Sequence, residues 1–285
     1  MPADRPVGRT AVALLAFAAN SLLCRSALAE TRIDAATFTA VRLAAGAGTL
    51  WLLVRVRRQH APLGGDWPSA LALFTYAAAF SFAYTSLTTA TGALLLFGAV
   101  QLTMIGAALR SGECLGLRAS SGVLIAASGV LVLLLPGLAA PPLAGALLML
   151  GAGVAWGIYS LRGRGSVSPL EDTAGNFLRA LAPALLLQLV FSTRVSPEPE
   201  GLLLAVLSGA LASGVGYAVW YSALPLLRKS SAATVQLAVP VLAALGGVVL
   251  LGEAVSLRLG FAAAAVLGGV AAALRAPADG APNGS

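Results

Sequence analysis

The two halves of this chain carry the same pattern of residues, and that internal repeat limits how the chain can fold. A Gly-Glu pair that begins at Gly112 returns at Gly252, 140 positions later, and both copies are followed by Leu-Arg. Further upstream, Tyr84 corresponds to Tyr221 at an offset of 137 positions. The sequence therefore predicts two copies of one structural unit.

Apolar stretches of about 20 residues recur along the whole chain, and each is long enough to cross a bilayer as a helix. Only 10% of the residues are charged, whereas a soluble domain carries about 25%. The surface of the folded chain must therefore face lipid. We predict an all-α integral membrane protein whose ten transmembrane helices span residues 10–29, 35–54, 69–88, 91–109, 116–135, 143–161, 173–192, 202–222, 231–250 and 257–274.

The distribution of basic residues predicts how the chain is oriented in the membrane. With the N-terminus in the cytoplasm, twelve Lys and Arg residues fall in inside loops and three in outside loops. Cytoplasmic loops carry such an excess of positive charge, so we expect both termini inside. The net charge of +7 is scattered singly over short loops, which argues against a nucleic-acid partner.

Five helices in each copy is an odd number, so the second copy enters the membrane from the opposite side. The two repeats are then inverted about an axis in the membrane plane, and such pairs produce alternating access in many secondary transporters. The predicted division is 1–137 for the first five-helix repeat, 138–275 for the second, inverted repeat and 276–285 for a disordered tail.

Three arginines, Arg25, Arg42 and Arg179, lie inside predicted helices. A charge at mid-helix costs about 2.5–3.5 kcal/mol. Arg25 lies near the outer end of its helix, where its side chain can reach the interface by snorkelling. Arg42 and Arg179 occupy corresponding places in the repeats, and two interpretations stay open: capping of carbonyls where a helix bends, or contact with an anionic group of a substrate.

Two aromatic faces also correspond to one another. Tyr76, Phe80 and Tyr84 recur every four residues and so share one helix face. The offset of 137 maps that face onto Ser213, Tyr217 and Tyr221. Two such faces are suited to lining a central cavity, and the alternative is a packed aromatic seam or an interfacial belt.

Isolated polar groups add candidates for a substrate path, although each of them can instead bridge neighbouring helices. These residues are Asn20, Gln101, Tyr159 and Gln236. Glu113 and Glu253 lie in turns ahead of the fifth and tenth predicted helices, where we expect each carboxylate to favour the positive end of the following helix dipole.

The chain lacks the residues that other chemistry would need. None of the eleven acidic residues lies well within a predicted helix, so a carboxylate proton relay is not expected. Two cysteines and the single His60 cannot assemble a metal site or a catalytic constellation. We therefore predict no metal, no cofactor and no enzymatic activity, and facilitated diffusion or exchange fits better than simple proton coupling.

Short motifs carry a family resemblance over essentially the whole chain. Asn20 precedes Arg25 in the first predicted helix, Phe38 precedes Arg42 in the second, and Trp156 begins a similar motif in the sixth. Together with the paired Gly-Glu turns, this pattern resembles the drug/metabolite transporter superfamily, specifically its EamA-type members. The first motif departs from the family's Trp-Gly-x-Asn-Phe, since only the Asn and the following basic residue are kept.

The resemblance implies a permease of the bacterial cytoplasmic (inner) membrane that moves small metabolites, with export of amino acids or related compounds as the expected function. An importer or exchanger of organic anions or sugars is the alternative. The expected partners are a small-molecule substrate and the lipid bilayer, and the chain acts as a monomer or homodimer. The substrate path that follows consists of Asn20, Tyr76, Phe80, Tyr84, Gln101, Trp156, Tyr159, Ser213, Tyr217, Tyr221 and Gln236.

Overall fold

The computed structural model describes residues 5–57, 62–112, 116–137, 140–193, 196–223 and 235–275. Within these ranges the chain is helical and contains no strand, so the predicted all-α class is confirmed. The helices in chain order are α1 (Arg5–Glu30), α2 (Ala35–Arg57), α3 (Trp67–Tyr84), α4 (Thr89–Arg110), α5 (Leu117–Leu134), α6 (Leu143–Arg162), α7 (Pro169–Phe191), α8 (Pro199–Leu207), η1 (Ser208–Val215), α9 (Gly216–Ala223), α11 (Ala238–Leu251) and α12 (Leu257–Arg275). The predicted tail at 276–285 lies outside the described residues, as do His60 and Glu113.

Each predicted span overlaps a helical segment, and α8, η1 and α9 follow one another without a break. The third prediction ran past the end of its helix, because α3 ends at Tyr84 and Thr88 already caps α4. The ninth prediction began at 231, whereas α11 begins at Ala238 and residues 231–234 are not described. The π-helical turns of η1 were not predicted from the sequence.

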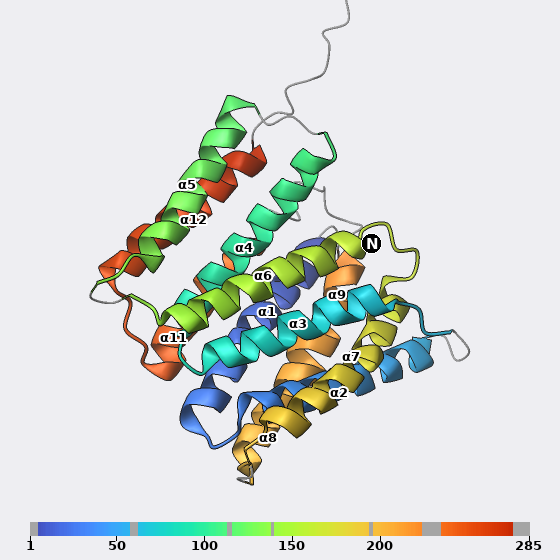
Figure 1. Cartoon of the computed structure of the whole chain (residues 1–285). Coiled ribbons are helices and arrows are strands. Elements are labelled where there is room, and N and C mark those ends of the chain that lie inside the picture. The colour runs from blue at the N-terminus through green and yellow to red at the C-terminus, as the bar shows by residue number, and fades with distance from the viewer. Residues whose placement is uncertain are drawn as a thin grey trace, which may run out of the picture.

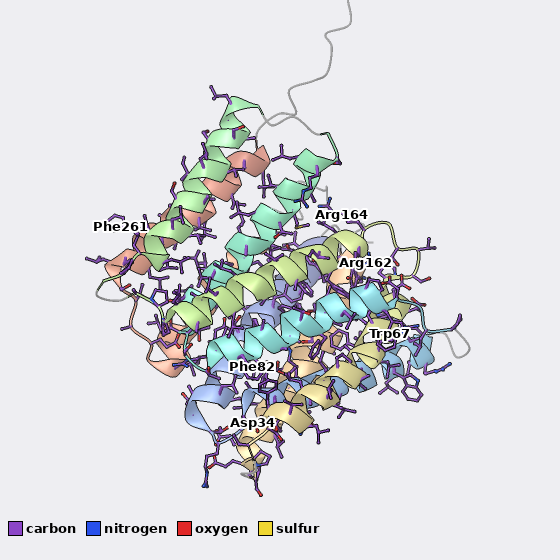
Figure 2. The ribbon with its side chains drawn as sticks, viewed as in Figure 1. Asp34, Trp67, Phe82, Arg162, Arg164 and Phe261 are labelled. Atoms are coloured by element: carbon purple, nitrogen blue, oxygen red, sulfur yellow. The ribbon has the colours of Figure 1, made fainter. Side chains whose placement is uncertain are left out.

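The outer surface of the helices is apolar. Eight of the described helical segments are long and apolar enough to cross a membrane; α11 is shorter, and α3 is not among them. Large apolar side chains project outward, including Leu117 at 88%, Leu189 at 82% and Phe261 at 73% exposed. Figure 2 shows Phe261 at the edge of α12, pointing away from the other helices. Soluble proteins rarely expose apolar surface of this extent. The chain is therefore a multi-pass membrane protein.

The helices pack in close pairs. Figure 1 shows α5 and α12 side by side at one edge of the molecule, with α4 next to them. A Cβ atom on Gly122 of α5 would lie 2.5 Å from the carbonyl oxygen of Gly269 of α12. A Cβ atom on Gly269 would likewise lie 2.5 Å from the Gly122 carbonyl oxygen. The two backbones therefore touch at these glycines, as small residues allow between membrane helices. Elsewhere α2 packs against α7, α6 against α3 and α4, and α1 against α9 and α11.

Polar residues fix the ends of the helices that matter for the site. The Asp66 carboxylate accepts a hydrogen bond from the Ser69 amide at 2.8 Å and begins α3. At the other end of the fold, Gly252 ends α11 with a φ of 62°. This left-handed geometry favours glycine, and the turn directs Glu253 toward the start of α4.

Candidate substrate cavity

A small cavity lies among α1, α3, α4, α6, η1 and α9. Half of its lining residues are aromatic, and the rings belong to Phe17, Tyr76, Phe80, Phe97, Trp156 and Tyr217. Four polar side chains complete the wall: Asn20, Ser21, Ser213 and Gln236. A concave, largely aromatic site with a few polar groups is typical of small-molecule binding.

The rings form one connected cluster across both halves of the chain. Trp156 stacks on Tyr217 with ring centroids 5.2 Å apart and planes 18° from parallel. Tyr76 lies 4.9 Å from Trp156 and 5.4 Å from Phe80, each measured between centroids. The two predicted aromatic faces thus meet at Trp156, which contacts Tyr76 from one and Tyr217 from the other.

A chain of hydrogen bonds runs beneath the cavity wall. Ser208 donates to the side-chain oxygen of Asn20 at 2.7 Å, and the Asn20 amide donates to the Tyr76 hydroxyl at 3.3 Å. The Arg42 guanidinium donates through Nη2 to the same hydroxyl at 3.0 Å. Arg42 is 1% exposed, and its Nε and Nη1 atoms have no hydrogen-bond partner among the described residues.

A second, polar cavity lies near the start of α3 and α7. We call the region around it the Asp66 end; it comprises Asp66, Ser69, Arg162, Asp172 and Asn176. Arg162 donates to the Ser69 hydroxyl and to the Asp66 carboxylate, each at 2.9 Å. The Asn176 oxygen accepts from the Asp66 amide at 2.9 Å. The Ser69 amide, and after it the Arg162 guanidinium, hold the pKa of the Asp66 carboxyl below its usual range.

The opposite region, which we call the Glu253 end (Arg25, Tyr84, Thr89 and Glu253), is joined by an ion pair. Arg25 donates through Nε to the Glu253 carboxylate at 3.2 Å and through Nη1 to the Tyr84 carbonyl at 3.0 Å. The same carboxylate accepts from the Thr89 amide at 2.8 and 3.1 Å, one distance for each oxygen. Three segments distant in sequence are therefore held together here.

These contacts correct two predictions. Glu253 does not interact with the N-terminus of the helix that follows it. Its carboxylate instead accepts hydrogen bonds at the N-terminus of α4. Arg25 does not reach for the interface by snorkelling, since its guanidinium is engaged by Glu253 and by the Tyr84 carbonyl. Glu113, the sequence counterpart of Glu253, lies outside the described residues.

Arg42 and Arg179 have different surroundings although they occupy corresponding positions. Arg179 donates through Nη1 to the Gly64 carbonyl at 2.7 Å. It therefore satisfies the backbone of the loop that precedes α3, which is close to the structural role considered for both arginines. Arg42 instead lies under the aromatic wall, 4.9 Å from the centroid of Phe80 and 5.3 Å from that of Tyr76.

The predicted path residues fall into three groups. Seven of them line the central cavity: Asn20, Tyr76, Phe80, Trp156, Ser213, Tyr217 and Gln236. Tyr159 and Tyr221 line the polar cavity at the Asp66 end. Tyr84 and Gln101 line neither; both are buried, and Tyr84 donates to the Thr89 carbonyl at 3.3 Å.

Sequence reasoning did not select five residues that also line the cavity: Phe17, Ser21, Leu96, Phe97 and Ala212. Ser21 adjoins Asn20, and Phe97 lies one turn before Gln101 on α4. A helical-face projection would have pointed from Asn20 to Phe17 and from Gln101 to Phe97, whereas Ser21 and Leu96 lie on other faces of their helices.

Helices of membrane-spanning length around a central cavity lined by aromatic and polar side chains define a polytopic membrane protein. The model of the EamA-like transporter family matches residues 143–275. An uncharacterized protein of Pseudomonas aeruginosa is 59% identical over 272 residues, which cover 95% of each chain. A solved crystal structure shares the fold with a TM-score of 0.63 over 93% of this chain and 97% of its own, at 24% identity.

The chain belongs to the EamA-like transporter family. The resemblance drawn from its sequence motifs is thereby confirmed. Members of this family are membrane transporters of small molecules and not enzymes, and the same description applies to this chain at that level.

Proposed function

We propose that the chain is a secondary transporter that exports amino acids or related small metabolites across the bacterial inner membrane by alternating access. The observation that carries the proposal is the central cavity, which combines ring faces from both halves of the chain with the polar groups of Asn20, Ser213 and Gln236. It fits the ligand class because a few polar groups orient a ligand while the apolar wall binds its body.

The pairing of helices supports two inverted five-helix repeats as the basis of the mechanism. α1 packs against α9 and α11, and α6 packs in the same way against α3 and α4. α2 with α7, α4 with α11 and α5 with α12 are pairs that an exchange of the two halves leaves unchanged. Such symmetry lets each half adopt the conformation of the other and open the site to the opposite face.

Glycine contacts support the same axis at the level of single residues. The contact between Gly122 and Gly269 becomes, at the offset of 140, a contact between Ala262 and Gly129. A Cβ on Gly129 would indeed lie 3.0 Å from the Ala262 carbonyl oxygen. The two repeats therefore approach one another reciprocally along α5 and α12.

Transport is tested by counter-flow in proteoliposomes against a panel of labelled amino acids and related metabolites, with and without a pH gradient. Truncation of Tyr217 to Ala removes a stacking partner of Trp156 and is expected to lower the rate about fivefold, since such ring pairs contribute about 1 kcal/mol. Phe261→Ala is the matched control, because this aromatic ring lies on the outer surface.

Equal insertion of both variants is checked by membrane fractionation. Unchanged counter-flow in Tyr217→Ala would remove the central cavity from the transport path. Absence of counter-flow for every compound in the panel would count against transport of this substrate class.

A further inference from the structure

We propose that the cavity recognises a carboxylate through the Tyr76 hydroxyl, with Arg42 behind it, so that the preferred substrate is a small monocarboxylate with a planar apolar body. The proposal rests on the proposed transport function and narrows its substrate class. It begins from an unusual feature of the core: a guanidinium that is almost fully buried and only partly hydrogen-bonded.

The hydrogen bonds to Tyr76 leave its hydroxyl as a donor. A phenol oxygen has two lone pairs and one proton. Here the Asn20 amide donates to it at 3.3 Å and the Arg42 Nη2 atom at 3.0 Å. With both lone pairs occupied, the proton of this cavity-lining hydroxyl is directed to a third group.

Ser213 adds a second hydroxyl to the lining of the same cavity. Its Oγ atom is buried and has no hydrogen-bond partner among the described residues. Together with Tyr76, it offers two hydroxyl protons to one space. Carboxylate oxygens accept several such bonds at once, whereas a primary ammonium group, which can only donate, would leave the Tyr76 proton unused.

The charges around the cavity also favour an anionic ligand. The titratable groups that face Arg42 are Tyr76, Tyr217 and Cys24, and all three side-chain types are ordinarily neutral at pH 7. Among the described residues, every acidic side chain lies in a loop or within a turn of a helix end: Glu30, Asp34, Asp66, Glu171, Asp172, Glu198, Glu200 and Glu253. Removal of a cation from water without a partner is costly, so an anionic ligand offsets a cost that the folded chain already carries.

Arg42 acts through Tyr76 and is a positioning residue. Its guanidinium lies behind the rings of Phe80 and Tyr76, at 4.9 and 5.3 Å from their centroids, and Arg42 is not part of the cavity wall. Arg179 makes the contrast clear, because its corresponding guanidinium is bonded to the Gly64 carbonyl and touches neither ring. Recognition of an anion is therefore expected to depend on the first arginine and not on the second.

The test measures how strongly the purified full-length protein prefers an acid over its neutral analogue. Phenylacetate and phenylacetamide have the same shape and differ in charge, and phenethylamine supplies the opposite charge. Binding is followed by the fluorescence of Trp156, which lines the cavity, after replacement of Trp51, Trp67 and Trp220 by Phe. The wild-type site is expected to bind phenylacetate about tenfold more tightly than the amide, a difference of about 1.4 kcal/mol.

Three variants separate recognition from folding. Arg42→Gln and Tyr76→Phe are each expected to bring the acid-to-amide ratio close to one while the affinity for phenylacetamide is kept. Retained amide binding shows that the cavity is intact, which a merely structural role of Arg42 would not predict. Arg179→Gln is the matched control and is expected to keep the wild-type ratio. Should Arg42→Gln fail to fold, Tyr76→Phe, which removes a single oxygen, decides the question.

A wild-type ratio near one would overturn the proposal, and so would a full acid preference in Tyr76→Phe. Counter-flow of phenylacetate in proteoliposomes separates this proposal from the proposed function. Preferential binding of the acid without counter-flow of any metabolite would support the recognition and count against transport. Counter-flow of other metabolites with no acid preference would support transport and overturn the recognition.

Discussion

Arg25 and Arg162 stand at the same place in the two halves of the chain, at an offset of 137, yet they do different things. Arg25 pairs with Glu253 at 3.2 Å, and the two side chains are 21% and 10% exposed. Arg162 pairs with Asp66 at 2.9 Å, and these side chains are 42% and 50% exposed. One ion pair is enclosed by helices and the other borders a polar cavity.

The difference shows that the ion pair at the Glu253 end is better shielded from solvent than the one at the Asp66 end. At the Glu253 end, Arg25 ties α1 to the end of α3, and Glu253 ties the turn after α11 to the start of α4. At the Asp66 end, Arg162 ties α6 to α3 beside the polar cavity lined by Tyr159 and Tyr221. Under the proposed alternating access, we assign the Glu253 end as the closed one and expect the pair of Arg25 with Glu253 to break before that end opens.

The largest effect is expected from Glu253→Gln. Loss of the carboxylate charge leaves Arg25 without its ion-pair partner in a poorly solvated place, which costs about 3 kcal/mol for a buried pair. The closed Glu253 end is then destabilised relative to an open one. We expect an impermeant maleimide added from this side to label Ser213→Cys at least about tenfold faster, since 1.4 kcal/mol corresponds to a factor of ten. Cys24 and Cys114 are replaced by Ser beforehand.

Asp66→Asn is the matched control, because it removes the corresponding charge at the other end. Labelling from the Glu253 side is expected to stay at the wild-type rate in this variant. A faster rate in both variants would mean that the substitutions loosen the whole fold, and an unchanged rate in Glu253→Gln would contradict the closure assigned to that end.

A smaller effect is expected from Arg25→Gln. This variant loses the guanidinium bond to the Tyr84 carbonyl, while Glu253 keeps its two bonds from the Thr89 amide. Combined with Glu253→Gln in a double-mutant cycle, it should reveal a coupling energy of about 1–2 kcal/mol, within the range for residues in direct contact. The labelling rate of Ser213→Cys is again the readout. Additive effects would show that the pair does not act as a unit.

The helices could be predicted from the sequence because apolar length is a local property. Each predicted span overlaps a helix, and the errors fall at helix ends. Loop chemistry decides such ends: Thr88 caps α4 by accepting from the Thr91 amide, so the predicted third helix could not continue to it.

The partners of the buried charges could not be predicted in the same way. Glu253 meets Thr89 across 164 positions of sequence, and nothing near Glu253 in the chain indicates which helix it will cap. Arg42 and Arg179 are equivalent in the repeat pattern, but only the packing of α2 against α3 places one of them beneath two rings. The aromatic faces were easier to recognise, because four-residue spacing already determines which side chains share a helix face.

At the Asp66 end, the cap of α3 is expected to matter more than the ion pair. Asp66→Ala removes the acceptor for the Ser69 amide and should lower stability by about 1 kcal/mol, the usual cost of losing an N-cap. Asp66→Asn keeps a side-chain oxygen for the cap and loses the pair with Arg162, which is half exposed and contributes little. Thermal unfolding in detergent should therefore rank Asp66→Ala well below Asp66→Asn. The reverse order would mean that the ion pair contributes more to stability than the N-cap.

The smallest expected effect is the pH dependence of the stability that the Asp66 carboxylate provides. Because the pKa of Asp66 is lowered in the folded chain, led by the Ser69 amide bond, the charged carboxylate stabilises the fold at pH values above the unfolded pKa, which is about 3.9 for Asp. That contribution disappears as the pH falls through the folded value. The melting temperatures of wild type and Asp66→Asn should consequently differ slightly at neutral pH and converge below about pH 4. A difference that grows on acidification would mean that the carboxylate is not stabilised by these contacts.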